Sequence, residues 1–163
     1  MEIERKYLVA QLPPNLEEFE HIEIEQGYLC TSPTLRIRKA GDAYILTVKE
    51  NRRSQSGAIV NREEEFALSP DDYKRLRTKC DRGFVTKTRY FIDLRRQTGD
   101  GLYSGLVAEL DIFHDANASL ILVEVEFPDE NVAKNFVKPI WFGDEVSSDP
   151  HYRNTYLAQK CLL

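Results

Sequence analysis

Charged residues recur two positions apart along this chain, and this spacing constrains the fold more than any other feature. In a β-strand, alternate side chains point to the same face. The segment Glu2-Ile3-Glu4-Arg5-Lys6 opens the series and puts two carboxylates and an ammonium on one face. The later pairs are Arg36 and Arg38, Thr47 and Lys49, Glu63 and Glu65, Lys87 and Arg89, Glu109 and Asp111, and Glu124 and Glu126. Because the intervening residues are mostly apolar, each segment predicts a strand with an apolar face and a charged face.

A half-solvated antiparallel sheet would also alternate apolar and charged residues. The signs of the charges favour a different interpretation. Like charges that are neighbours on one face repel, so ordinary solvated surfaces mix the two signs. Here four pairs are purely acidic and two are purely basic. Sorting by sign along strands is what a cavity needs if it is to hold cations on one side and a polyanion on the other.

The secondary structure predicted from the sequence is mainly β. We expect strands near residues 2–9, 21–30, 34–39, 43–50, 58–68, 84–95, 103–113 and 120–128. Ser69-Pro70-Asp71-Asp72 supplies an N-cap, a proline and first-turn acids, which predicts a helix through about Lys79. Further helices are expected from Asp129 and from Asp149-Pro150. In the helix that begins at Asp129, the buried side should carry Val132, Ala133, Phe136 and Val137.

The expected architecture is an α+β, mainly β, single domain over residues 1–163, with eight antiparallel strands closed into a barrel. The helices need an apolar surface to pack on, and the apolar strand faces, such as that of Val123, Val125 and Phe127, supply it. The charged faces would then line the interior. Because such an interior is too costly to be dry, we expect it to hold water, ions and a ligand.

Composition excludes several other classes of protein. A net charge of −5 argues against a general nucleic-acid binder, which needs a basic surface. No apolar run is long enough to span a membrane, and no phosphate-binding loop of the GxxxxGK[ST] type occurs. Three widely spaced cysteines, Cys30, Cys80 and Cys161, are typical of reduced thiols, so we expect a cytoplasmic protein.

Taken in order, the charged pairs resemble the CYTH domain of the triphosphate tunnel metalloenzymes. The opening Met1-Glu-Ile-Glu-Arg-Lys-Tyr-Leu-Val is similar to that of the small single-domain bacterial members. So are Gln26-Gly27-Tyr28-Leu29, Trp141-Phe142-Gly143 and Tyr152-Arg153-Asn154, and the resemblance covers nearly the whole chain. It implies an eight-stranded tunnel that binds a small triphosphate and uses Mg²⁺ or Mn²⁺.

The resemblance and side-chain chemistry together imply three sets of site residues. Phosphate oxygens would be bound by Lys6, Arg36, Arg38, Lys49, Lys87, Arg89 and Arg153. Metal would be held by Glu2, Glu4, Glu63, Glu65, Asp111, Glu124 and Glu126, with Glu109 as a further acid of the tunnel. Lys87 and Tyr28 would activate or orient the attacking water. The run Glu63-Glu64-Glu65 leaves open whether Glu64 faces inward instead, and Tyr28 and Arg153 also fit a core aromatic and a helix-surface arginine.

The leading function is metal-dependent hydrolysis of a triphosphate, with inorganic tripolyphosphate yielding pyrophosphate and phosphate. One alternative is an adenylate cyclase that makes cyclic AMP from ATP, since the tunnel motifs do not distinguish the two enzymes. The other is a non-catalytic module that binds polyphosphate or organophosphates, which would gain nothing from so many carboxylates. No feature of the sequence establishes a homodimer, although one is possible.

Overall fold

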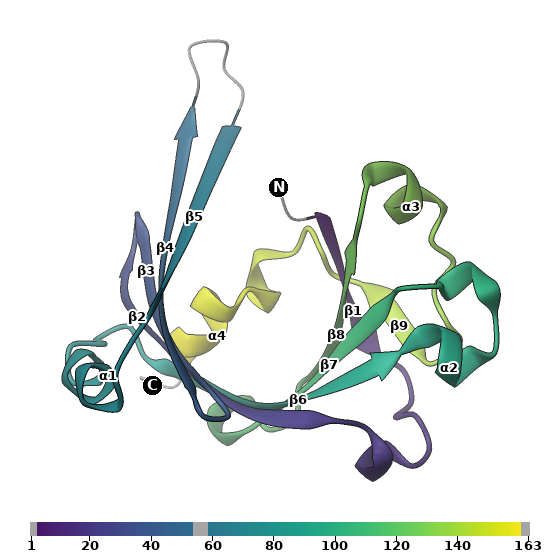
Figure 1. Cartoon of the computed structure of the whole chain (residues 1–163), viewed down its shortest axis with the longest axis horizontal. Helices are drawn as coiled ribbons and strands as arrows, with labels where there is room; N and C mark the ends of the chain where they lie inside the picture. The colour runs from purple at the N-terminus through teal and green to yellow at the C-terminus, as the bar shows by residue number, and fades with distance from the viewer. Residues whose placement is uncertain (1–2, 54–58, 161–163) are drawn as a thin grey trace. The chain divides into compact units, whose positions relative to one another are not determined.

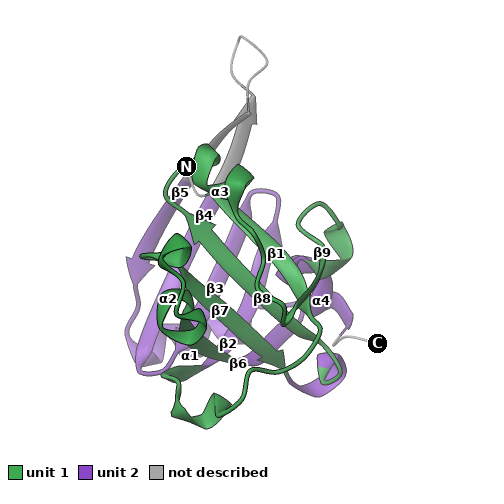
Figure 2. Cartoon of the chain, turned by 90° about the vertical axis from the view of Figure 1, so that its right-hand side faces the viewer, with its two compact units in different colours: residues 1–22, 88–113, 118–152 green, residues 23–87, 114–117, 153–163 purple. Residues whose placement is uncertain are grey.

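A computed structural model describes residues 3–53 and 59–160 of the chain (Figure 1). The described residues divide into two compact units, each built from separate stretches of the sequence (Figure 2). Unit 1 comprises residues 1–22, 88–113 and 118–152, and unit 2 comprises residues 23–87, 114–117 and 153–163. The single domain expected from the sequence remains a prediction.

The described chain is mainly β, as predicted, with nine strands and four α-helices. The strands are β1 (Ile3–Val9), β2 (His21–Thr31), β3 (Thr34–Ala40), β4 (Ala43–Arg53), β5 (Ile59–Ala67), β6 (Phe84–Asp93), β7 (Val107–Phe113), β8 (Ile121–Phe127) and β9 (Phe142–Glu145). Their order in the sheet is β5-β4-β3-β2-β6-β7-β8-β1-β9. This order has β5 and β9 at its two ends, so the described strands form one nine-stranded sheet.

The ninth strand is the one that the sequence did not predict. Strand β9 has only four residues and no alternation of apolar and charged side chains, so it carries no strand signal of its own. It pairs antiparallel with β1, through Tyr7 with Glu145 and Val9 with Phe142. A Cβ atom on Gly143 would lie 3.1 Å from the carbonyl oxygen of Leu8, so this close pairing favours a glycine there.

In unit 2, the helix predicted after Ser69 is confirmed as α1 (Pro70–Arg77). The hydroxyl of Ser69 accepts a hydrogen bond of 3.1 Å from the backbone N–H of Asp72, as the capping sequence requires. Helix α1 lies beside β3 and β4 (Figure 1). Its buried Tyr73 packs against Tyr44 of β4, with ring centroids 5.1 Å apart. This helix therefore covers one face of the unit 2 strands and leaves the other face for charged side chains.

In unit 1, the apolar faces of β1, β7 and β8 form the core together with α2 (Leu94–Thr98) and α3 (Glu130–Asn135). Asp129 caps α3 by accepting a hydrogen bond from the backbone N–H of Val132. The inward placement predicted for Val137 is wrong, because the backbone is extended at Phe136 and Val137 is 67% exposed. Helix α2 was not predicted, since the sequence suggested a continuous strand up to residue 95.

Short helical segments complete the described chain. Four 3₁₀ segments lie at Leu16–Glu18, Gly101–Tyr103, Asp115–Asn117 and Pro150–Tyr152. The helix expected from Asp149-Pro150 is split into the last of these segments and α4 (Asn154–Gln159). Within the described residues, no helix combines the length and the apolar character needed to span a bilayer.

Candidate active site

In unit 1, the charged faces of β6, β7 and β8 bring three carboxylates onto one guanidinium. Arg89 contacts Asp111 through two parallel hydrogen bonds of 2.7 Å, from Nε to Oδ1 and from Nη2 to Oδ2. It also donates to Glu109, and at 3.0 Å to Glu124. We call these four residues the Arg89 cluster. Asp111 is fully buried, so the bidentate contact takes the place of the hydration that its carboxylate loses.

The guanidinium of Arg89 stays charged in these surroundings. Burial alone would lower its pKa, because a charged group loses hydration when it is buried. The hydrogen bonds and charge of Asp111, with the charges of Glu124 and Glu109, outweigh that effect and raise the pKa above its ordinary value. The sequence predicted Arg89 as a phosphate ligand, and in this structure most of its donors are engaged by carboxylates.

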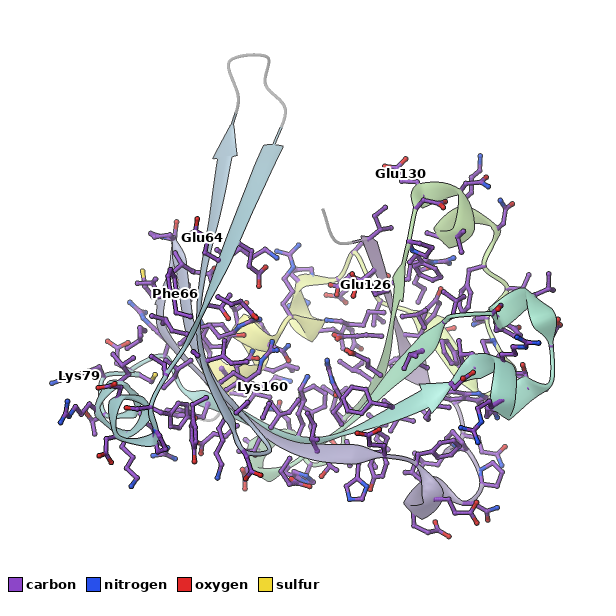
Figure 3. All side chains as sticks on the ribbon, in the orientation of Figure 1. Glu64, Phe66, Lys79, Glu126, Glu130 and Lys160 are labelled. Carbon is purple, nitrogen blue, oxygen red and sulfur yellow. The ribbon has the colours of Figure 1, made fainter. Side chains whose placement is uncertain are left out.

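Strand β1 adds a lysine and a glutamate to the same charged face. Lys6 and Glu124 are cross-strand partners of β1 and β8, and the lysine Nζ lies 2.7 Å from Glu124 Oε1. Two residues along β1 from Lys6, Glu4 lies opposite Glu126, which is labelled on β8 in Figure 3. Two carboxylates directly opposite each other repel, so this pair favours a cation between or beside them.

In unit 2, the charged faces of β3, β4 and β5 carry a second group of charges. Arg36 Nη2 lies 3.3 Å from Glu63 Oε1 and 3.8 Å from Glu65 Oε1. Lys49 Nζ lies 3.0 Å from Glu63 Oε2. Thr47 is buried between them, where it accepts from Arg36 at 3.3 Å and donates to Glu65 at 3.2 Å. We call these five residues the Arg36 cluster.

One donor of the Arg36 cluster lacks a partner among the described residues. The Nε–H of Arg36 is buried and makes no hydrogen bond within residues 3–53 and 59–160. A buried donor without an acceptor is costly, and a guanidinium can be satisfied only by an acceptor. An anion such as a phosphate oxygen provides that acceptor and the opposite charge.

Strand β2 places polar side chains beside the same face. Gln26 lies opposite Arg38, and Tyr28 lies opposite Arg36, in the register of β2 with β3. Arg38 Nε donates to Gln26 Oε1 at 3.0 Å, and Gln26 Nε2 donates to the Tyr28 hydroxyl oxygen at 2.5 Å. Lys87, on β6, is only 2% exposed. Both predicted catalytic residues, Tyr28 and Lys87, therefore lie in unit 2 with buried side chains.

The register of β5 bears on the choice between Glu63 with Glu65 and Glu64, which the sequence left open. Glu63 and Glu65 pair with Lys49 and Thr47 of β4 and share the face of the Arg36 cluster. Glu64 pairs with Val48 instead, and Figure 3 shows it on the same side of β5 as Phe66. Glu63 and Glu65, not Glu64, thus share the face of the Arg36 cluster.

The two remaining predicted residues contribute less to the described geometry. Glu2 lies outside the described residues. Arg153 is exposed at the N-cap of α4. Its position fits the helix-surface arginine that the sequence also allowed, and a phosphate contact through it remains a prediction.

Sequence reasoning missed two residues of this site. Thr47 was noticed only as a neighbour of Lys49, and it proves to be a buried link between Arg36 and Glu65. Gln26 was noticed only as part of a motif. The signal that would have found Gln26 is its position two residues before Tyr28, which puts both side chains on one face of β2.

The carboxylates of unit 1 fit a hard divalent cation by their chemistry, because Mg²⁺ and Mn²⁺ prefer oxygen ligands. Within the described ranges, no three His, Cys, Asp or Glu side chains form a group that could hold a metal ion as they stand. Three of the acids converge on Arg89 instead. The opposed pair Glu4 and Glu126 adds two carboxylates of neighbouring strands to this donor set.

Comparison with known proteins shows relatives over almost the whole chain. The profile of the CYTH domain family matches residues 1–111. An inorganic triphosphatase of Nitrosomonas europaea is 37% identical over 161 residues, covering 96% of each chain. Another, from Acetivibrio thermocellus, is 30% identical and covers 97% of this chain and 93% of its own. The crystal structure of inorganic triphosphatase NE1496 matches with a TM-score of 0.70 at 35% identity, over 98% of this chain and 95% of that chain.

Proposed function

Because the chain belongs to the CYTH domain family, we propose that it is a metal-dependent hydrolase of inorganic triphosphate. The observation that carries this proposal is the similarity, over nearly the full length of both chains, to two proteins named inorganic triphosphatase. In the reaction, a water oxygen bonds to a terminal phosphorus of tripolyphosphate. The P–O–P bond breaks, pyrophosphate leaves, and the proton of the water passes to solvent or to the leaving group.

We propose that the basic residues predicted from the sequence bind the phosphate groups. These are Lys6, Arg36, Arg38, Lys49, Lys87, Arg89 and Arg153. The buried Nε–H of Arg36 supports the assignment most directly, because a phosphate oxygen would satisfy it. Arginine suits the task, since its planar fork can engage two phosphate oxygens at once.

The acidic residues would hold the metal, Mg²⁺ or Mn²⁺. On this proposal the donors come from Glu2, Glu4, Glu63, Glu65, Asp111, Glu124 and Glu126, with Glu109 beside them. When bound, the metal would neutralise part of the phosphate charge and polarise a phosphoryl oxygen. The oxygen chemistry of the set and the opposed Glu4 and Glu126 support this assignment.

Lys87 and Tyr28 would orient the attacking water. Both are almost fully buried, at 2% and 3% exposure, so packing restricts where their polar ends can point. A fixed donor near a reacting oxygen contributes to catalysis by positioning and by stabilising charge that develops in the transition state. Lys87→Ala should therefore lower kcat strongly, and a normal kcat in that variant would remove Lys87 from the proposed mechanism.

A closed tunnel formed by eight of the strands also belongs to this proposal. Its support is the parity of the strands, since in each unit one face is apolar and the other carries the charges. We also propose a cytoplasmic location, because the widely spaced cysteines are typical of reduced thiols, and a possible homodimer.

The test is phosphate release by the purified protein from tripolyphosphate, ATP, thiamine triphosphate and pyrophosphate, with Mg²⁺ or Mn²⁺. Each reaction needs an EDTA control, and the ATP reactions need an assay for cyclic AMP. The proposal expects rapid, EDTA-sensitive release from tripolyphosphate in preference to the other substrates. Cyclic AMP without orthophosphate would make the protein a cyclase. Binding of tripolyphosphate without any turnover would make it a binding module.

A further inference from the structure

A buried glutamine lies between two of the residues assigned to the proposed active site. Gln26 is 1% exposed, and each end of its amide makes a hydrogen bond. Resting on the proposed function, we propose that Gln26 is a positioning residue: it holds the guanidinium of Arg38 for the phosphate chain and orients the hydroxyl of Tyr28.

The orientation of the amide follows from the chemistry of its partners. A guanidinium can only donate, so the group that faces Arg38 Nε must be the amide oxygen of Gln26. The amide nitrogen then faces Tyr28 and donates to the phenolic oxygen. Because that oxygen accepts from Gln26, the O–H of Tyr28 must be donated in another direction. Gln26 therefore determines how the Tyr28 proton is presented.

The neutral charge of Gln26 matters as much as its geometry. Arg36 and Arg38 are two apart on β3, and Arg36 already has carboxylate neighbours in Glu63 and Glu65. The amide of Gln26 accepts from Arg38 without adding a negative charge. A carboxylate in its place would offset the positive charge of Arg38 and repel an incoming polyphosphate.

The position in the sheet makes the arrangement rigid. Gln26 and Arg38 are direct cross-strand partners, as are Tyr28 and Arg36, and all four side chains lie on one face. Gly27, between the two β2 residues, lies where an added Cβ would collide with the ring of Phe84 on the opposite face. The side chain of Gln26 is itself almost fully buried, so it has little freedom to turn away from Arg38 and Tyr28.

Two substitutions separate the contributions of geometry and charge. Gln26→Met keeps the length of the side chain but removes both hydrogen bonds. Misplacement of catalytic groups by about 1 Å can cost about 10²-fold in rate, so kcat/KM for tripolyphosphate should fall by about that factor. Gln26→Glu keeps the shape of the side chain and adds a negative charge. Its carboxylate has no hydrogen to donate, so it can only accept a hydrogen bond from the hydroxyl of Tyr28. We expect it to raise KM more than Gln26→Met does and to lower kcat as well.

A buried polar residue can also matter for folding alone, so the experiment needs a matched control. Asn117 in the same unit is 5% exposed, and its amide nitrogen donates to the carbonyl oxygen of Leu157 at 3.1 Å. Asn117→Leu should lower the free energy of unfolding without changing kcat or KM of the folded enzyme. If Gln26→Met behaves like Asn117→Leu, Gln26 is structural only and the inference is overturned.

A double-mutant cycle supplies a readout that a structural role would not move. If Gln26 acts through Tyr28, Gln26→Met should add little to the loss of kcat already caused by Tyr28→Phe. Fully additive losses would refute action through Tyr28. Wild-type activity is measured first, so that failure of the proposed function is recognised separately. An inactive wild type would overturn that function and the premise of this inference, whereas an active wild type with unaffected Gln26 variants would overturn the inference alone.

Discussion

Replacing Arg89 with methionine should destabilise the protein far more than the same replacement at Arg5. Both arginines make a bidentate contact with a carboxylate, Arg89 with Asp111 and Arg5 with Glu145. The two pairs differ in burial. The side chains of Arg89 and Asp111 are 13% and 1% exposed, whereas those of Arg5 and Glu145 are 27% and 39% exposed.

The difference in burial sets the expected magnitudes. Removing one partner of a buried ion pair leaves an uncompensated charge and costs about 3–5 kcal/mol. The loss at Arg89 should lie in this range, because Glu109 and Glu124 also lose their common partner. An exposed pair is worth about 0.2–1 kcal/mol. Arg5 also donates to the carbonyl oxygen of Ala133, so its replacement should cost about 1–2 kcal/mol in total.

The assay is urea denaturation of the wild type, Arg89→Met and Arg5→Met at neutral pH. The two variants should differ in free energy of unfolding by about 1–4 kcal/mol. For a chain of 163 residues, the expected loss at Arg89 corresponds to a fall in Tm on the order of 10 °C. A third variant, Arg89→Met with Asp111→Leu, should recover part of the loss, because two apolar side chains replace a broken ion pair.

Two results would refute this reasoning. The first is a loss at Arg89 no greater than the loss at Arg5, which would mean that Asp111 does not depend on the guanidinium. The second is a double variant that is no more stable than Arg89→Met alone. In that case the instability would come from lost packing of the arginine stem and not from the unpaired carboxylate.

Three further predictions concern other parts of the chain. Glu4→Gln should lower tripolyphosphate turnover by about 10²-fold or more, because an amide is a poor ligand for a hard cation. Calorimetry should still detect binding of tripolyphosphate. Unchanged turnover would exclude Glu4 as a metal ligand. Gly27→Ala should lower the free energy of unfolding by about 1 kcal/mol, because the half-buried ring of Phe84 must shift to make room for the Cβ atom, and wild-type stability in urea would contradict this. Arg77 donates two hydrogen bonds to Glu25 and thereby lowers the pKa of this carboxyl group. The ionised Glu25 therefore stabilises the fold at pH values above the ordinary glutamate pKa. That stabilisation is lost as the pH falls through the lowered pKa. Denaturation at decreasing pH should show a flatter loss for Glu25→Gln than for the wild type, and equal slopes would refute the assignment.

The sequence predicted the strands and their charged faces well because parity is a local property. A doublet such as Glu124 and Glu126 fixes which side chains share a face as soon as the segment is a strand. The eight strands predicted this way are confirmed, with boundaries that differ by a few residues at some ends. The short strand β9 and helix α2 were missed because neither carries a period long enough to be recognised.

Contacts across strands could not be predicted, because they depend on register. Nothing local to β3, β4 or β5 shows that Glu63 lies beside Lys49 while Glu64 lies opposite Val48. The same limit applies to Gln26, whose importance comes from its partner on β3 and not from its own segment. A register shift of one residue would have moved every one of these side chains to the other face.

The ion pairs within each unit place a condition on the proposed function. Lys6 is paired with Glu124, Lys49 with Glu63, and Arg89 with Asp111, so the cations assigned to phosphate are already partly neutralised. A polyanion alone would have to break these pairs and leave carboxylates beside its own negative charges, which is unfavourable. A divalent cation bound to the carboxylates would release the lysines and arginines to the phosphates, so that every charge keeps an opposite partner. The intermixing of acids and bases therefore favours a substrate that arrives with metal over a polyphosphate that binds by itself.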